Sequence, residues 1–149
     1  MNHEHFMSVA LGLAREAAFE LEPPVGCVIV DACGAVVGSG RNRREKEKSA
    51  IAHAEIEAIA AACRSVGDWR LDGLTLYVTL EPCPMCAGAI IVSRISSVFY
   101  GARDKQAGSC GSVVNLFMEP YGHKVRITGG ILGDECSALM SGFFSSIRK

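Results

Sequence analysis

Residues 74–86 read LTLYVTLEPCPMC, a strongly apolar run that leads straight into a Cys-x-x-Cys pair. The apolar part, residues 74–80, predicts a buried strand. Pro84 predicts a helix that starts at once, because proline at the first helical position loses no backbone hydrogen bond. Cys83 and Cys86 are three positions apart, so on that helix both thiolates can reach one metal ion. The positive end of the helix dipole lies nearby and favours the thiolate form.

The second informative stretch is His53-Ala54-Glu55. One neutral imidazole from His53 and two thiolates satisfy a zinc ion and leave its fourth tetrahedral position open, as in catalytic zinc sites. A water bound there has a pKa of about 7, so hydroxide is available at neutral pH. Glu55 stays free of the metal and can move protons. These residues together predict a zinc site that activates water.

An isolated Cys-x-x-Cys pair has plainer interpretations, a redox pair or half of a structural zinc knuckle. The other five cysteines show no ligand spacing, so a four-cysteine site would require a coincidence of the fold. We expect those five to be small buried hydrophobic residues; they are Cys27, Cys33, Cys63, Cys110 and Cys136. His-x-Glu combined with Pro-Cys-x-x-Cys favours the catalytic interpretation.

Length and composition predict one cytoplasmic domain. The chain has 149 residues, which suits a single hydrophobic core. Residues 84–92, the longest uninterrupted apolar stretch, are too few to span a bilayer. Seven cysteines, an odd number partly committed to metal, fit a reducing compartment. The net charge of -1 does not indicate nucleic-acid binding, and the charged run 41–48 is typical of a solvated loop.

Apolar periodicity predicts alternating helices and strands. The expected elements are a helix at 5–19, strands at 25–30 and 35–38 joined by a turn at 31–34, a helix at 53–65, the strand at 74–80, the Cys83 helix, strands at 95–100 and 125–128, and a helix at 134–147. Pro23-Pro24 and Gly67 are expected to end helices, Gly38 and Gly40 to close the hairpin, and Asp134 to cap the last helix. This order predicts an α/β three-layer sandwich with a mixed, largely parallel-paired central sheet flanked by helices.

The motifs resemble the cytidine deaminase superfamily and, within it, the bacterial tRNA-specific adenosine deaminases. The resemblance covers nearly the whole chain, and residues 101–116 are its most discriminating segment. Besides the zinc signature, the matching motifs are Pro24-Val25-Gly26, Gly40-x-Asn42-Arg43, Thr79-Leu80-Glu81-Pro82-Cys83, Met85-Cys86-Ala87-Gly88-Ala89, Gly101-Ala102-Arg103-Asp104 and Asp134-Glu135-Cys136.

The resemblance implies a cytidine deaminase-like fold and hydrolytic deamination of adenosine to inosine at the wobble position of a tRNA anticodon. His53, Cys83 and Cys86 would bind one Zn²⁺ per chain, and hydroxide would attack adenine C6. Glu55 would deliver protons to the ring and to the leaving amine, which departs as ammonia. The implied partners are a tRNA anticodon stem-loop and a second copy of the chain in a homodimer, with residues 1–149 forming a single deaminase domain.

The resemblance also suggests substrate contacts. Asn42 would hydrogen-bond the flipped nucleoside, although a loop asparagine often bonds its own backbone instead. Backbone groups at Ala54 and near Glu81 could read the base edge. Arg103 and Asp104 would lie beside the pocket, where Asp104 could accept from a ribose 2′-hydroxyl or simply cap the amides of its own turn.

Two rival functions stay open: a deaminase of a free base or nucleotide, such as guanine, cytosine or deoxycytidylate, and a non-catalytic zinc-stabilised binding module. The chain departs from the family pattern in the charged run 44–48 and in ending at Arg148-Lys149 without a longer basic tail. Basic surface for RNA must then come from local clusters and from both halves of a dimer.

Overall fold

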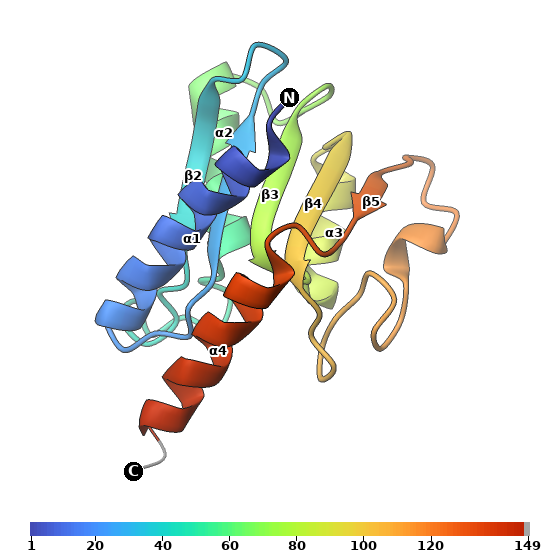
Figure 1. Cartoon of the computed structure of the whole chain (residues 1–149). Coiled ribbons are helices and arrows are strands. Elements are labelled where there is room, and N and C mark those ends of the chain that lie inside the picture. The colour runs from blue at the N-terminus through green and yellow to red at the C-terminus, as the bar shows by residue number, and fades with distance from the viewer. Residues whose placement is uncertain (148–149) are drawn as a thin grey trace.

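The computed structural model describes residues 1–147; Arg148 and Lys149, the last basic residues of the sequence, lie outside the described part. Within 1–147, five strands form one sheet in the order β2-β1-β3-β4-β5 (Figure 1). The strands are β1 Gly26–Val30, β2 Val36–Arg41, β3 Thr75–Leu80, β4 Ser97–Ala102 and β5 Arg126–Thr128. β1 pairs antiparallel with β2 and β3, whereas β4 pairs parallel with β3 and β5. The mixed sheet is confirmed, with half of the pairings parallel because β1 of the hairpin lies between β2 and β3.

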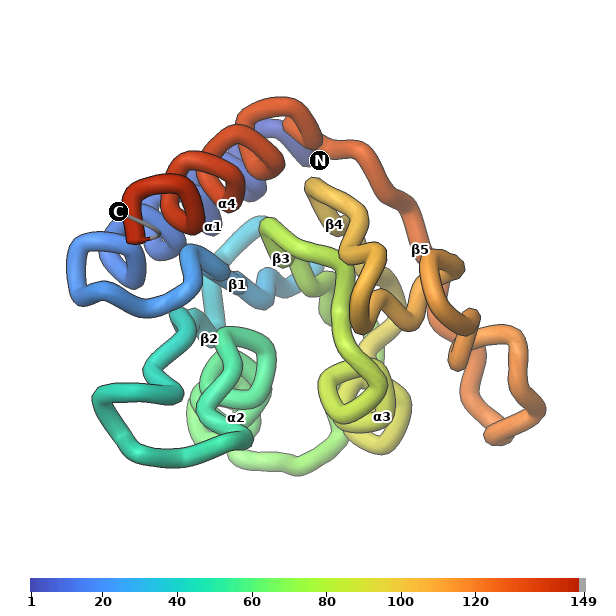
Figure 2. Tube along the Cα trace, turned by 90° about the horizontal axis from the view of Figure 1, so that it is seen from below, coloured from blue at the N-terminus to red at the C-terminus, as the bar shows by residue number. Residues whose placement is uncertain are grey.

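Helices cover both faces of the sheet, so the predicted three-layer sandwich is confirmed. Figure 2 shows α1 (His3–Phe19) and α4 (Gly133–Ile147) on one face and α2 (Ala54–Val66) and α3 (Pro84–Val92) on the other. Each layer boundary buries its own apolar cluster. A short 3₁₀ turn, η1 (Leu116–Met118), lies in the long connection between β4 and β5. In the part of the chain described here, no helix combines the length and apolar character needed to cross a membrane.

The residues that end α1 and begin α4 are not the ones that the sequence predicted. Residue Leu21 takes a left-handed backbone conformation (φ 63°), and Glu22 N–H donates to the Ala17 carbonyl at 2.9 Å. This turn ends α1 before Pro23 is reached. α4 begins at Gly133, so Asp134 lies inside the first turn and does not precede it as a cap. Gly67 ends α2 as expected, in a left-handed conformation (φ 74°).

The prediction that Gly38 and Gly40 close the hairpin is wrong, because both lie inside β2. Because these two glycines have no side chains, the backbone of α2 can lie directly against the backbone of β2. A Cβ on Gly38 would collide with the backbone at Ala58, and one on Gly40 with the Ala54 carbonyl. Glycine at a strand interior can mark such a close approach as well as a turn, and sequence alone did not separate the two.

This packing gives a stability prediction. Gly40→Ala should lower the free energy of unfolding by about 1–3 kcal/mol, because the added methyl group must push α2 away from β2. Gly12→Ala is the matched control: it lies inside α1 with nothing within 4 Å of its would-be Cβ. It should raise stability by about 0.5–1 kcal/mol. Urea unfolding measures both, and a Gly40→Ala chain as stable as the parent would contradict the close-packing account.

Candidate active site

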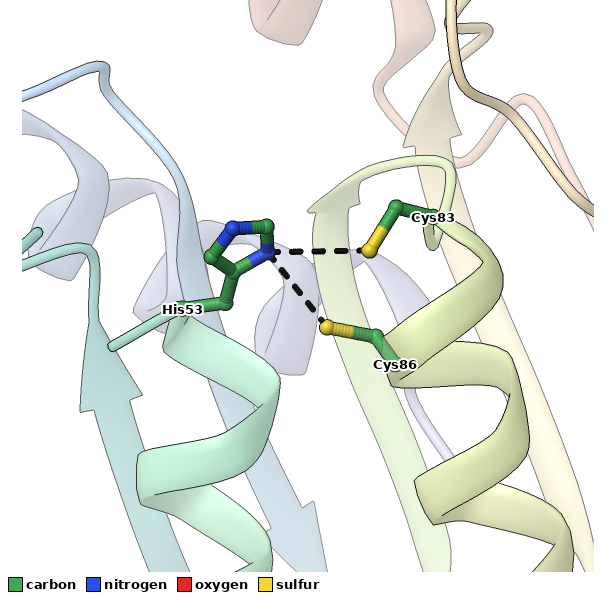
Figure 3. A group of neighbouring side chains, drawn as sticks. All are labelled: His53, Cys83 and Cys86. Carbon is green, nitrogen blue, oxygen red and sulfur yellow. Dashed lines mark hydrogen bonds between the residues drawn. The ribbon is translucent and has the colours of Figure 1, made fainter. Parts of the chain in front are cut away.

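Two helix N-termini converge at one edge of the sheet. β2 and β3 are both antiparallel to β1, so they run in the same direction and end at the same edge. His53 is the N-cap residue of α2 and Cys83 is the N-cap residue of α3, and neither side chain caps its own helix. Pro84 takes the first helical position as predicted, and Cys86 follows in the first turn. Figure 3 shows the imidazole and the two thiols pointing toward one another.

The three side chains have the spacing of a metal triangle. His53 Nδ1 lies 3.7 Å from Cys83 Sγ and 3.6 Å from Cys86 Sγ, and the three ligand atoms lie within 4.8 Å of one another. Tetrahedral zinc with ordinary Zn–N and Zn–S bonds separates a nitrogen from a sulfur by about 3.6 Å. The two nitrogen–sulfur separations therefore fit a zinc ion, and three protein ligands leave one position for water.

The charges of the triangle also suit a cation. The pKa of Cys83 is lowered to about 4 by a hydrogen bond from Cys86, with a further contribution from His53. The pKa of Cys86 is raised, because this thiol donates to the Cys83 thiolate and is buried. The site thus favours the thiolate form of Cys83, and a metal ion would displace the proton that stays on Cys86.

Glu55 lies in the first turn of α2, on the same side as the triangle but outside it. Glu55 is 4% exposed, and burial raises the pKa of its carboxyl group to about 7. A carboxyl group that titrates near neutral pH can both accept and deliver a proton. Glu55 is not one of the three clustered ligands, so this acid remains available for proton transfer.

His53, Cys83 and Glu55 border a cavity of about 560 Å³. The structure brings every residue predicted for the site to this place: six line the cavity together with Cys83, and Cys86 is buried next to it. The six are Asn42, His53, Ala54, Glu55, Arg103 and Asp104. Sites assembled at the carboxyl ends of strands are usual in α/β folds.

Asn42 and Asp104 both make the plainer contacts that the sequence left open. Asn42 Oδ1 accepts from Arg44 N–H at 3.0 Å. Asp104 Oδ1 accepts from the backbone N–H groups of Gln106 and Ala107 at 3.0 and 3.3 Å. Each side chain also lines the cavity, so one end holds its own loop and the other can face a ligand. The Glu81 N–H donates to the Ala102 carbonyl at 2.8 Å and cannot read a base edge.

Sequence reasoning missed the contribution of α4. One face of this helix lines the cavity, with the residues Ser137, Met140, Ser141 and Phe144. Their spacing of three and four residues is visible in the sequence. Only the sandwich topology shows that this face turns toward the metal edge, so the spacing alone gave no functional signal.

Most cations of the run 41–48 are neutralised within the fold. Arg41 and Lys46 pair with Glu20 at 2.8 and 3.2 Å, and Arg43 pairs with Glu57 at 3.5 Å. Hydrogen bonds from Arg41 and Lys46 lower the pKa of Glu20 to about 2. Among residues 1–147, Arg44 and Arg103 line the cavity and form no ion pair.

A His-Cys-Cys triangle with an adjacent unligated glutamate is the arrangement of the zinc nucleobase deaminases. A family model described as the cytidine and deoxycytidylate deaminase zinc-binding region matches residues 1–102. The tRNA-specific adenosine deaminase of Bacillus subtilis is 44% identical over 147 residues, which are 98% of this chain and 91% of that protein. The chain therefore belongs to the cytidine and deoxycytidylate deaminase family, among the tRNA-specific adenosine deaminases.

Other similarities extend this comparison. The tRNA(Ile)-lysidine synthase of Deinococcus deserti is 41% identical over 143 residues, 96% of this chain, and the chain spans 27% of that longer protein. A solved structure from studies of A-to-I editing by tRNA:A34 deaminases superposes with a TM-score of 0.87 at 41% identity, covering 91% of this chain and 98% of the other. Guanine deaminase from Bacillus subtilis superposes with a TM-score of 0.68 at 34% identity, covering 95% and 94%.

The separation of ligands from proton carrier gives the second prediction. Glu55→Ala should retain one zinc per chain and lose about 10²–10⁴-fold in turnover, because it removes the proton carrier but no ligand. Cys83→Ala should lose the metal and much stability, since metal binding is coupled to folding. Elemental analysis and thermal unfolding measure both variants. Comparable zinc loss in Glu55→Ala would reassign Glu55 as a ligand.

Proposed function

We propose that this chain is a zinc-dependent enzyme that hydrolyses adenosine to inosine at the wobble position of a tRNA anticodon. The observation that carries the proposal is that a triangle of zinc geometry and a buried, unligated Glu55 open into one cavity. The site defines the reaction class, and the similarity to tRNA-specific adenosine deaminases over nearly the full length of both chains supports the substrate.

The proposed chemistry divides between the metal and Glu55. His53, Cys83 and Cys86 would hold one zinc ion, which, when bound, would supply a water whose pKa is lowered to about 7. Glu55 is placed to accept a proton from the attacking water and to pass it to the adenine ring as the new C6–O bond forms. Glu55 then assists proton transfer to the exocyclic amine, and the C6–N bond breaks. Water and adenosine become inosine and ammonia, so atoms and charges balance.

The walls of the cavity suit a nucleotide that has been extruded from an RNA loop. Asn42 uses its carbonyl oxygen on Arg44 N–H, so its amide N–H₂ group remains as a donor toward the nucleoside. Asp104 retains a carboxylate oxygen that can accept from a 2′-hydroxyl. Arg44 and Arg103, which form no ion pair in the described part of the chain, can approach phosphates.

The third prediction concerns the substrate. A short RNA hairpin with adenosine at the wobble position should be converted to inosine, whereas free adenosine should be nearly inert. An unpaired loop base costs little to extrude, and contacts to its neighbours supply the orientation that a free nucleoside lacks. Guanine and cytidine compounds, assayed alongside, cover the rival function that the guanine deaminase fold raises. Efficient deamination of these and none of the hairpin would remove the tRNA assignment.

A charge-reversal pair sharpens the same assay. Arg103→Glu should weaken hairpin binding and reduce its salt dependence, because one phosphate contact is lost. Arg126→Glu is the control, since Arg126 pairs opposite Ser97 at the far end of β4 from the cavity. Equal effects of both substitutions would mean that only overall charge matters and that Arg103 makes no local contact.

We propose further that the whole chain acts as a single deaminase domain, in the cytoplasm, as a homodimer. A group of exposed apolar side chains, called the apolar patch below, supports the dimer: all four belong to the segment between β4 and β5, whose 3₁₀ turn η1 lies near α3. Its members are Val113, Val114, Met118 and Tyr121. Apolar surface of this kind is typical of subunit interfaces.

The fourth prediction tests that patch. Met118 is 79% exposed, and Met118→Asp should convert a dimer to a monomer by placing a charge in the interface. Phe19, which is 92% exposed at the end of α1, offers the control substitution Phe19→Asp, which should leave the dimer intact. Sedimentation equilibrium measures the mass of each, and a monomeric parent chain would reject the dimer.

A further inference from the structure

Glu81 is a buried carboxylate that the proposed reaction does not use. It follows the last residue of β3 and precedes Pro82-Cys83, and it is 2% exposed. Its carboxylate accepts four hydrogen bonds from one segment, residues 104–112. Oε1 accepts from Asp104 N–H at 3.0 Å and from the Ser112 hydroxyl. Oε2 accepts from Cys110 N–H at 2.8 Å and from Ser112 N–H at 3.1 Å.

No cation neutralises this carboxylate among the residues that the structure describes. The backbone and hydroxyl donors therefore do all the stabilising, and a buried charge without them would be costly. Gly108 packs so closely on the carboxylate that any Cβ there would collide with it. The Ser109 N–H also donates to the Pro82 carbonyl at 2.8 Å. Residues 104–112 are thus held in place by hydrogen bonds to the Glu81 carboxylate and to the Pro82 carbonyl.

The loop held in this way forms one wall of the substrate cavity. Arg103, Asp104 and Lys105 line the cavity, and Asp104 is joined to Glu81 through its own N–H. Glu81 stands two residues before Cys83 in the chain. One side chain therefore connects the strand end that carries a metal ligand to the loop that would contact RNA.

We propose that Glu81 is a positioning residue that sets the substrate-binding conformation of residues 103–112. The proposal rests on the function proposed above, because it assumes that this wall contacts RNA. Glutamine has nearly the shape of glutamate but presents N–H₂ where the loop presents N–H donors. Glu81→Gln therefore breaks the hydrogen bonds to one carboxylate oxygen without removing volume from the core.

The fifth prediction is tested by hydrogen exchange together with hairpin kinetics. In Glu81→Gln, amide exchange should rise in residues 104–112, while zinc content stays at one per chain. The kcat/KM for the RNA hairpin should fall about 10- to 100-fold, as for other residues whose hydrogen bonds orient the groups that contact a ligand. Most of this loss should appear in KM, because Glu55 and the metal ligands are unchanged. Ser112→Ala, which removes only the hydroxyl donor, should give a smaller change of the same kind.

Glu22→Gln is the matched control. Glu22 is 1% exposed and accepts from the N–H groups of Glu45 and Lys46 at 3.0 and 2.8 Å. Its substitution should raise exchange in residues 43–49 and leave residues 104–112 unchanged. Exchange that rises through the whole sheet in Glu81→Gln, or that stays unchanged in 104–112, overturns the positioning role, as does loss of zinc. If the parent chain leaves the hairpin unconverted, the proposed function fails, and the exchange data still decide whether Glu81 holds the loop.

Discussion

The meeting of the N-termini of α2 and α3 is the constraint on which the rest of the site depends. β2 and β3 end at the same edge because both pair antiparallel with β1, and each is followed by a helix on the same face of the sheet (Figure 2). The free N–H groups and positive dipole ends of both helices therefore share one region. Thiolates and the oxygen of an attacking water carry the negative charge that such a region stabilises. The fold topology alone thus creates a positive electrostatic potential at this edge of the sheet, independently of the side chains.

The distance between the two helix ends depends on small residues in the core. α2 turns Ala54, Ala58 and Ala62 toward the sheet, and Gly38 and Gly40 of β2 leave no side chain between strand and helix. Backbone packed on backbone allows little adjustment, since neither partner can change rotamer. His53 is the N-cap residue of this helix, so its position depends on how closely α2 packs on Gly38 and Gly40 of β2. Its ring lies 3.6–3.7 Å from the two thiols. The packing of the core therefore helps to set the geometry of the metal ligands in this protein.

The sequence predicted the chemistry of the site better than its surroundings. His53, Cys83, Cys86 and Glu55 were recognisable because metal ligation and proton transfer require particular residue types at short spacings. The elements around them were found because their apolar periodicity is strong. The four hydrogen bonds to Glu81 span 31 residues or fewer but depend on how a loop folds back, which periodicity does not encode. The α4 face was missed for the same reason: its spacing is local, whereas its place over the cavity depends on the whole sandwich.

The ordering of the cavity walls bears on how a chain of net charge -1 would recognise RNA, as the proposed function requires. Glu20 and Glu57 neutralise most of the basic run, so long-range attraction to phosphates is weak. Glu22 accepts from the N–H groups of Glu45 and Lys46, which follow Arg44 of the cavity lining, and Glu81 accepts from the backbone of residues 104–112. Asn42 and Asp104 each hold their own loop with one oxygen. The entropy of ordering these loops is then lost on folding, and it does not have to be lost again when RNA binds. Affinity in such a site comes from a few preorganised contacts, which also favours a single extruded base over a long tract of backbone.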